Sequence, residues 1–202
     1  IKHPLETQEK VLFSLLEQAK KTEYGQLYGF ESIKNYEAFN QQVPVVTYED
    51  FEPFIEKARQ GISDVSWHGK IKHFAKSSGT TNAKSKFIPI SDESLENCHY
   101  KAGKDLLAIY INNHRDSNLF KFKNLRLGGS AQLYESFGTK FGDLSAILIE
   151  NLPFWVERTT TPSKKTSLMS EWETKLKAII SEVQKENVGS LTGVPSWMMV
   201  LL

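Results

Sequence analysis

One stretch of this sequence combines small, polar and basic residues in a way that suits anion binding. Between positions 77 and 86 it reads Ser77-Ser78-Gly79-Thr80-Thr81-Asn82-Ala83-Lys84-Ser85-Lys86. A phosphate chain is bound by backbone N–H groups that converge without obstruction, by short hydroxyl donors and by cations. Gly79 helps to free the backbone, because it carries no Cβ atom. The donors and cations are supplied by Ser77, Ser78, Thr80, Thr81, Lys84 and Lys86. We therefore expect an anion-binding loop at these positions.

The obvious alternative is the P-loop of nucleotide triphosphatases, in which a glycine is followed by four residues and then by Gly-Lys-Ser/Thr. Counted from Gly79, the second glycine would fall on Lys84 and the lysine on Ser85. The segment after the loop contains Pro89 and resembles a strand, whereas a P-loop is followed by a helix. A phosphotransferase of the P-loop type therefore predicts a helix directly after Lys84, and we expect a strand.

The elements that position this loop can be read from its flanks. Residues 71–76 alternate in polarity and residues 87–90 are β-like, which predicts strand, loop and strand. The alternating lysines before the loop, of which Lys76 is the last, are interpreted as a solvated face and left out of the site. Ser91 or Asp92 can then cap a long helix whose apolar face is formed by Leu95, Ala102, Leu106, Ile109 and Tyr110. The loop is thus anchored on both sides.

The rest of the chain alternates helical patterns with short β-like runs. Helices are expected at 5–21, which Gly25 and Gly29 would end, and at 35–41. A third is expected at 47–61, with Thr47 as its N-cap and Asp50 as the capping-box partner. A fourth is expected at 170–186, and its inward face consists of Trp172, Leu176, Ile179, Ile180 and Val183. Strands and turns are expected around 124–130 and 189–195, and residues 144–156 suit a buried helix or a strand. This alternation favours an α/β or mixed architecture.

The loop also resembles a known motif. It is similar to the first nucleotide motif of the auxin-responsive acyl acid amido synthetases, the Gretchen Hagen three family. The matching pattern is Ser-Ser-Gly-Thr-Thr, then two residues, Lys-Ser-Lys, two further residues and Pro. Further segments resemble bacterial members in the same order: Thr22 to Gly25, Val43 to Val45, the helix at 47–61 and Gly193 to Trp197. The resemblance implies an α/β fold with mixed sheets flanked by helices, as in the large N-terminal domain of firefly-luciferase-like adenylate-forming enzymes. Residues 1–202 would be the N-terminal portion of that domain, with the C-terminal domain absent.

The resemblance also implies a reaction. A carboxylic acid attacks the α-phosphorus of ATP to give acyl-AMP and pyrophosphate, and an amine, usually an amino acid, then displaces AMP. The loop would grip the β- and γ-phosphates through Ser77, Ser78, Gly79, Thr80, Thr81 and Asn82, with Lys84 and Lys86 acting beside Mg²⁺. Where this chain has Ala83, family members often have glycine, so Asn82 would take the left-handed conformation. The adenine, ribose and metal motifs are expected downstream, so the fragment alone is expected to be inactive.

Two alternatives remain open at this stage. A non-catalytic ligand-binding or scaffold domain would keep the fold and lack the remaining motifs. A thioester-forming ligase would use coenzyme A in place of the amine.

A second group of residues could contact the acid. Asn151, Phe154 and Trp155 could wall an acyl pocket, since such pockets combine apolar and aromatic groups with a few polar ones. Packing in the core is the alternative for both aromatic residues. Gly193 to Ser196 is either a plain turn or a loop near the substrate.

The bulk composition excludes several classes of protein. With 25 basic and 24 acidic side chains the net charge is +1, so neither nucleic acid nor an anionic membrane is expected as a partner. The five histidines and single cysteine have no metal-ligand spacing, no serine-hydrolase elbow is present, and no run approaches the roughly 20 apolar residues of a membrane helix. One cysteine suits a reducing cytoplasm. The apolar end of the chain from Trp197 onward suggests a fragment.

Overall fold

The computed structural model describes residues 2–77, 85–128 and 133–201. The chain divides into two compact units, each of which uses two separate stretches of sequence. Unit 1 consists of Ile1–Ser91 and Glu135–Lys140, and unit 2 consists of Asp92–Tyr134 and Phe141–Leu202. The architecture is mixed α/β, which confirms the predicted fold class.

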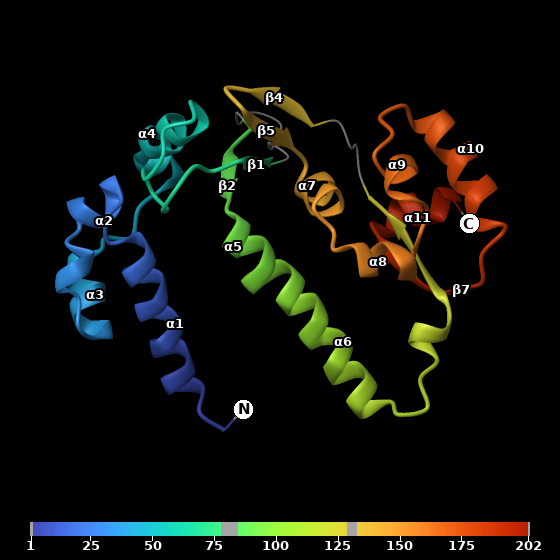
Figure 1. The fold of residues 1–202 in the computed structure, drawn as a ribbon, viewed down its shortest axis with the longest axis horizontal. Coiled ribbons are helices and arrows are strands. Elements are labelled where there is room, and N and C mark those ends of the chain that lie inside the picture. The colour runs from blue at the N-terminus through green and yellow to red at the C-terminus, as the bar shows by residue number, and fades with distance from the viewer. Residues whose placement is uncertain (1, 78–84, 129–132, 202) are drawn as a thin grey trace. The chain divides into compact units, whose positions relative to one another are not determined.

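Unit 1 begins with four helices, drawn in blue to teal in Figure 1. They are α1 (Pro4–Ala19), α2 (Glu23–Leu27), α3 (Tyr36–Gln42) and α4 (Tyr48–Arg59), with a 3-10 turn η1 (Phe30–Ser32) between α2 and α3. Three of them confirm predicted helices, with ends within about two residues of those expected. Asn35 caps α3 by accepting a hydrogen bond from the Ala38 N–H at 2.8 Å.

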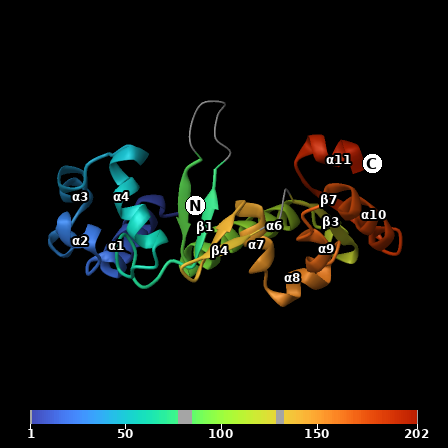
Figure 2. The same cartoon turned by 90° about the horizontal axis from the view of Figure 1, so that it is seen from above.

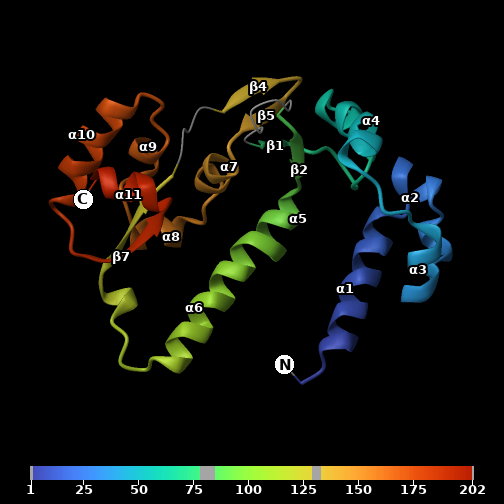
Figure 3. The same ribbon diagram turned by 180° about the vertical axis from the view of Figure 1, so that it is seen from behind.

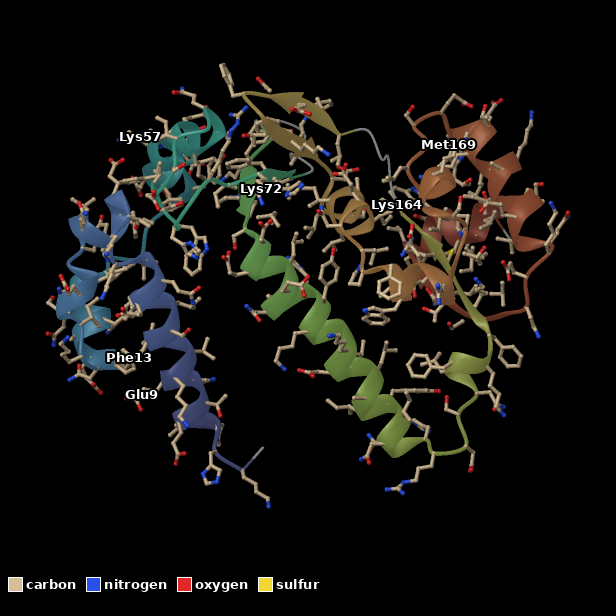
Figure 4. The ribbon with its side chains drawn as sticks, in the orientation of Figure 1. Glu9, Phe13, Lys57, Lys72, Lys164 and Met169 are labelled. Atoms are coloured by element: carbon tan, nitrogen blue, oxygen red, sulfur yellow. The ribbon has the colours of Figure 1, made fainter. Side chains whose placement is uncertain are left out.

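The role predicted for Gly25 is wrong in an informative way. Gly25 does not end a helix but lies inside α2, which Thr22 caps by accepting from the Gly25 N–H at 3.0 Å. A Cβ atom at this position would lie 2.1 Å from the carbonyl oxygen of Ala19. Glycine is therefore required because α2 starts directly against the end of α1. Lys57 of α4, labelled in Figure 4, forms an ion pair with Glu23 of α2 at 2.5 Å and so links α4 to the start of α2.

The start of α4 carries the predicted capping box. The Thr47 hydroxyl accepts from the Asp50 N–H at 3.3 Å, and the Asp50 carboxylate accepts from the Thr47 N–H at 3.0 Å. The Thr47 hydroxyl also donates to the Asp50 carboxylate at 2.8 Å, and this bond first, followed by the one from the Thr47 N–H, holds the pKa of Asp50 below its usual value. The first turn of α4 is thereby fixed, and with it the direction of Tyr48 and Glu49.

The sheet of unit 1 has the strand order β2-β1-β5-β4. Strands β1 (His73–Lys76) and β2 (Phe87–Ile90) are antiparallel, with Lys76 opposite Phe87, and Figure 2 shows them side by side. This confirms strand, loop and strand. Ser85 and Lys86 are not helical and β2 follows them, so the P-loop alternative is wrong. Strands β4 (Tyr134–Ser136) and β5 (Thr139–Gly142) were not predicted.

Unit 2 is built on a three-stranded sheet of order β6-β3-β7, in which all pairs are parallel. The strands are β3 (Lys123–Leu127), β6 (Thr160–Thr161) and β7 (Val188–Gly193). Leu125 and Leu127 of the central strand form a buried cluster with Ile179 of α10 (Trp172–Val183) and Met198 of α11 (Pro195–Leu201). Figure 3 shows these two helices beside the strands. The cluster is the core of this unit around β3.

The long helix predicted after the loop is confirmed, but it is not uniform. It consists of α5 (Asp92–Ser94), a π-helical segment η2 (Leu95–Tyr100) and α6 (Lys101–Asn113). Only part of its apolar face is covered: Leu95 is 4% exposed, whereas Leu106 is 69% and Ile109 is 62% exposed. No helix in the described ranges combines the length and apolar character that a membrane crossing demands.

The remaining elements of unit 2 are short. They are the 3-10 turn η3 (Leu119–Lys121), α7 (Leu144–Glu150), α8 (Phe154–Thr159) and α9 (Lys164–Ser167). The helix-or-strand ambiguity at 144–156 therefore resolves into two helices separated at Pro153. Lys164, labelled in Figure 4, donates a hydrogen bond to the carbonyl oxygen of Glu150. In α10 the inward position predicted for Ile180 is wrong, since Ile180 is 44% exposed and Lys175 is 2% exposed.

Replacing Gly25 by alanine tests the contact between α1 and α2. The added Cβ atom would overlap backbone atoms of Ala19, so we expect a loss of about 1–3 kcal/mol in the free energy of unfolding. The control is Gly103→Ala in α6, where nothing lies within 4 Å of the new atom and a gain of about 0.5–1 kcal/mol is expected. Urea denaturation measures both. Equal stability of the two variants would contradict the proposed packing.

Candidate functional site

The predicted phosphate loop is closed at its base by two backbone donors. The Ser77 N–H donates to the Lys86 carbonyl at 2.8 Å, and the Lys86 N–H donates to the Ser77 hydroxyl at 2.9 Å. Ser78, Gly79, Thr80, Thr81, Asn82 and Lys84 lie outside the described residues. Their roles therefore stay predictions, and the base of the loop is what the structure describes.

Lys86 is held at the start of α4. Its ammonium group lies 3.0 Å from the Glu49 carboxylate and 4.8 Å from the centre of the Tyr48 ring. The Tyr48 hydroxyl accepts from the Phe87 N–H at 2.9 Å, so the same helix end also fixes the first residue of β2. The pKa of Glu49 is lowered, first by its own backbone N–H and then by Lys86. The Lys86 side chain is 41% exposed and that of Glu49 is 68% exposed, so the ion pair contributes little free energy.

Unit 2 contains a cavity of about 940 Å³. That volume lies within the roughly 300–1,000 Å³ typical of small-molecule sites. The cavity is bounded by the η2 and α6 helices, the turn around η3, the strands β3 and β7, and the helices α7 and α8. Its apolar walls include Leu107, Phe120, Leu148, Leu152 and Trp155. The arrangement suits a largely apolar small molecule that carries a few polar groups.

The sheet supplies one group of polar side chains to this cavity. Asn124 donates from its side-chain amide to the hydroxyls of Ser190 at 2.9 Å and Thr192 at 3.0 Å. All three residues line the cavity, and the parallel register places Asn124 opposite Ser190. Their mutual hydrogen bonds leave Arg126, the next residue on this face of β3, without a share in the network.

Arg126 is one of three charged residues among those that line the cavity, with Lys104 and Asp143, and the sequence analysis predicted none of them. Its Nε and Nη2 atoms are buried, and neither has a hydrogen-bond partner within the part of the chain that the structure describes. Burial lowers the pKa of Arg126, while the negative field of Glu157 acts in the opposite direction. A signal was present: Arg126 stands between Leu125 and Leu127, so the alternation of a strand places it on the face opposite the core.

Tyr100 forms a second polar feature of the cavity wall. Its hydroxyl donates to the carbonyl oxygen of Leu148 in α7 at 3.0 Å, which links the η2 segment to α7. Burial raises the pKa of Tyr100 to about 12. The phenol therefore remains neutral through the physiological range of pH.

Of the residues predicted to contact the acid, only Trp155 lines the cavity. Lys104 places its ammonium group 5.7 Å from the centre of the Trp155 ring. Phe154 is 71% exposed, and the Asn151 amide donates to the Ile147 carbonyl at 2.8 Å and so ends α7. The core-packing alternative is wrong for both aromatic residues, because Trp155 is itself 43% exposed.

The segment from Gly193 to Ser196 is a connection between a strand and a helix, and whether it lies near a substrate stays a prediction. It leads from β7 into α11, and Gly193 and Val194 also line the cavity. A Cβ atom on Gly193 would lie 2.7 Å from the Leu127 carbonyl oxygen, so glycine permits the close approach of β7 to β3.

Residues 2–77, 85–128 and 133–201 contain no candidate metal site made of side chains. No group of three or more histidine, cysteine, aspartate or glutamate residues converges there.

Comparison with known proteins gives a consistent picture. A profile described as the GH3 family N-terminal domain matches residues 1–201. The jasmonoyl–L-amino acid synthetase JAR6 of Nicotiana attenuata is 40% identical over 90 residues, which cover 44% of this chain and 16% of the relative. The indole-3-acetic acid-amido synthetase GH3.2 of Arabidopsis thaliana is 34% identical over 96 residues, which cover 47% of this chain and 18% of the relative.

Solved structures share the fold. The GH3.15 acyl acid amido synthetase superposes with a TM-score of 0.79 at 19% identity, over 97% of this chain and 35% of that one. The same enzyme in complex with 2,4-DB superposes with a TM-score of 0.74 at 22% identity. The chain thus spans about a third of the length of these enzymes.

The Tyr100 hydroxyl gives a prediction for alkaline pH. Its pKa is raised from about 10 in the unfolded chain to about 12 in the folded one, so the folded state holds the proton more tightly. The contribution of Tyr100 to stability is complete below pH 10 and is lost as the pH rises towards 12. Tyr100→Phe should therefore flatten the fall in unfolding free energy over this range, measured by urea denaturation. The control is Tyr36→Phe at an exposed position, and equal slopes in the two variants would contradict the assignment.

Proposed function

We propose that this chain, which belongs to the GH3 family through that family's N-terminal domain, takes part in the ATP-dependent joining of a carboxylic acid to an amine. The acid is activated as acyl-AMP with release of pyrophosphate, and the amine, an amino acid by analogy with the relatives' names, displaces AMP. The observation that carries this proposal is the hairpin of β1 and β2, closed at its base by Ser77 and Lys86. A loop that grips phosphate between two strands needs such a fixed base.

Within this proposal the loop acts by charge and position. Activation of the acid moves negative charge onto the leaving pyrophosphate, so positioned cations and N–H donors lower the barrier. Lys84 and Lys86 supply the cations, and Ser77 to Asn82 supply hydroxyl and backbone donors. The weak ion pair of Lys86 with Glu49 supports this assignment. It holds the ammonium group near the base of the loop, and little free energy is needed to separate that group from Glu49.

The cavity of unit 2 is proposed as the site of the acid. Its volume and its apolar walls suit a carboxylic acid with a ring or a branched alkyl body. The relatives are named for jasmonic acid and indole-3-acetic acid, and a structural neighbour was solved with 2,4-DB. Trp155 offers a face for stacking of such a body, whereas Asn151 and Phe154 do not line this cavity. The single cysteine, Cys98, is compatible with a reaction in the reducing cytoplasm.

Exchange of labelled pyrophosphate into ATP tests the first half of the reaction, and it is best measured on a protein that spans the full length of the relatives. We expect exchange that depends on a carboxylic acid. Its absence with every acid of a broad panel would favour a scaffold that binds ligand without turnover. Product analysis with amino acids and with coenzyme A then decides the acceptor.

Lys84→Ala is expected to slow this exchange about ten- to a hundredfold. The variant removes a charge-assisted contact to phosphate of about 1.5–3 kcal/mol. The matched control is Lys76→Ala, an exposed lysine of β1 on the other side of the loop, which should retain the exchange rate. Equal rates for both variants would rule out the assignment of Lys84.

Glu49→Gln tests whether Lys86 changes partner when ATP binds. Without the Glu49 carboxylate, no anion competes with the phosphates of ATP for Lys86. The KM for ATP should therefore fall by about two- to fivefold, the range expected for an exposed ion pair. Lys86→Gln should raise the KM for ATP, and adding Glu49→Gln to that variant should not alter the KM further. An unaltered KM in Lys86→Gln would show that Lys86 only braces the hairpin.

A further inference from the structure

Strand β2 forms one edge of the sheet of unit 1, because the strand order is β2-β1-β5-β4. In an antiparallel pair, residues that bond the partner strand alternate with residues whose backbone groups point to the other side. Lys86 bonds Ser77 through both its N–H and its carbonyl group, so the backbone of the next residue, Phe87, points to the open edge. Pro89 is the next residue that points outward, and proline has no N–H. The Phe87 N–H is therefore the backbone donor that β2 presents at its open edge.

Helix α4 holds Phe87 from both of its ends. Tyr48 is the first residue of α4, and its hydroxyl accepts the hydrogen bond from the Phe87 N–H at 2.9 Å. Arg59 is the last residue of α4, and its guanidinium carbon lies 3.8 Å from the centre of the Phe87 ring. The backbone and the side chain of one residue are thus fixed by two different contacts. The start of β2 therefore has a defined position along α4.

The ring of Tyr48 contacts the residue that precedes Phe87. The Lys86 ammonium nitrogen lies 4.8 Å from the ring centre, within the roughly 6 Å over which an aromatic face attracts a cation. Glu49 also contacts this ammonium group, but a carboxylate competes with phosphate for the cation. An aromatic ring attracts the cation and leaves its charge in place. Tyr48 thus restrains the backbone next to Lys86 as well as the end of the Lys86 side chain.

We propose that Tyr48 is a positioning residue for phosphate binding, which holds the ammonium group of Lys86 where the β- and γ-phosphates of ATP bind. This inference rests on the proposed function, in which Lys86 contacts those phosphates. Tyr48 acts through its hydroxyl on the backbone of Phe87 and through its ring on Lys86. A cation that is already ordered loses less conformational entropy when it binds an anion. Loss of Tyr48 should therefore weaken ligands that carry these phosphates and spare the others.

The comparison of ATP with AMP tests this role, because AMP lacks the β- and γ-phosphates. Isothermal titration of a protein that spans the full length of the relatives gives the dissociation constants of both nucleotides. Tyr48→Phe keeps the ring and removes the acceptor for the Phe87 N–H. The affinity for ATP should fall by about three- to tenfold, which lies within the effect of one hydrogen bond, and the affinity for AMP should stay within about twofold. An equal change for both nucleotides would overturn the proposal.

Double variants test whether the ring acts through Lys86. Tyr48→Leu also removes the contact between the ring and the ammonium group, so the affinity for ATP should fall by a further two- to fivefold relative to Tyr48→Phe. When each change is combined with Lys86→Gln, the two double variants should bind ATP equally, because no ammonium group remains for the ring to hold. A difference of the same size in the absence of Lys86 would overturn the role of the ring.

Tyr36→Phe is the matched control. Tyr36 is the first residue of α3, as Tyr48 is of α4, and it also follows a capping residue. Its side chain is 61% exposed, so Tyr36→Phe should keep both affinities. Thermal denaturation of the same variants separates positioning from folding. A structural role alone would lower the melting temperature of Tyr48→Phe and weaken ATP and AMP alike, and that result would contradict the assignment.

Failure of this inference can be distinguished from failure of the proposed function. If pyrophosphate exchange proceeds and Tyr48→Phe binds ATP as tightly as Tyr36→Phe does, the function stands and the role of Tyr48 falls. If Tyr48→Phe weakens ATP and spares AMP but no exchange occurs with any acid, the role of Tyr48 stands and the activation chemistry falls.

Discussion

The covering of a parallel sheet on both faces is the constraint on which unit 2 depends. Hydrogen-bonded parallel strands are normally buried on each side, so the central strand β3 cannot leave either face to bulk water. One face is covered by α10 and α11 through the cluster around Leu125 and Leu127. The other face, with Asn124 and Arg126, borders the cavity. The alternation of five residues along one strand therefore separates the core from the candidate site.

A different constraint acts in unit 1, where the end of a helix positions the end of a loop. The capping box of Thr47 and Asp50 fixes the first turn of α4. The next two residues, Tyr48 and Glu49, contact Phe87 and Lys86 at the point where the loop rejoins the sheet. A local interaction between residues three apart thus determines where the cation near the loop is held. This part of the site depends on helix capping more than on burial.

Local signals in the sequence predicted the elements that local interactions fix. The cap at Thr47 and the strands around the loop were found because their determinants lie within a few residues. The β4–β5 hairpin and the burial of Lys175 were missed, since they depend on partners distant in sequence. For the same reason Trp155 was placed with Asn151 and Phe154, although of these three residues only Trp155 lines the cavity. The loop motif predicted the family, whereas the position of Arg126 beside a cavity depends on helices that cover the other residues of that sheet face and are distant from it in sequence.

The buried guanidinium of Arg126 links folding to ligand binding. Buried donors without partners among the described residues lower the stability of the free chain, because their desolvation is not offset. A ligand that binds only the folded state adds RT ln(1 + [L]/Kd), about 2.7 kcal/mol when the ligand is at 100 times its dissociation constant, and any relief of the desolvation cost is already contained in that constant. At equal occupancy an anion and a neutral ligand therefore stabilise the chain equally. A charge beside the cavity acts on the dissociation constants of its ligands, whereas an apolar residue at the same position would act on the stability of the free chain.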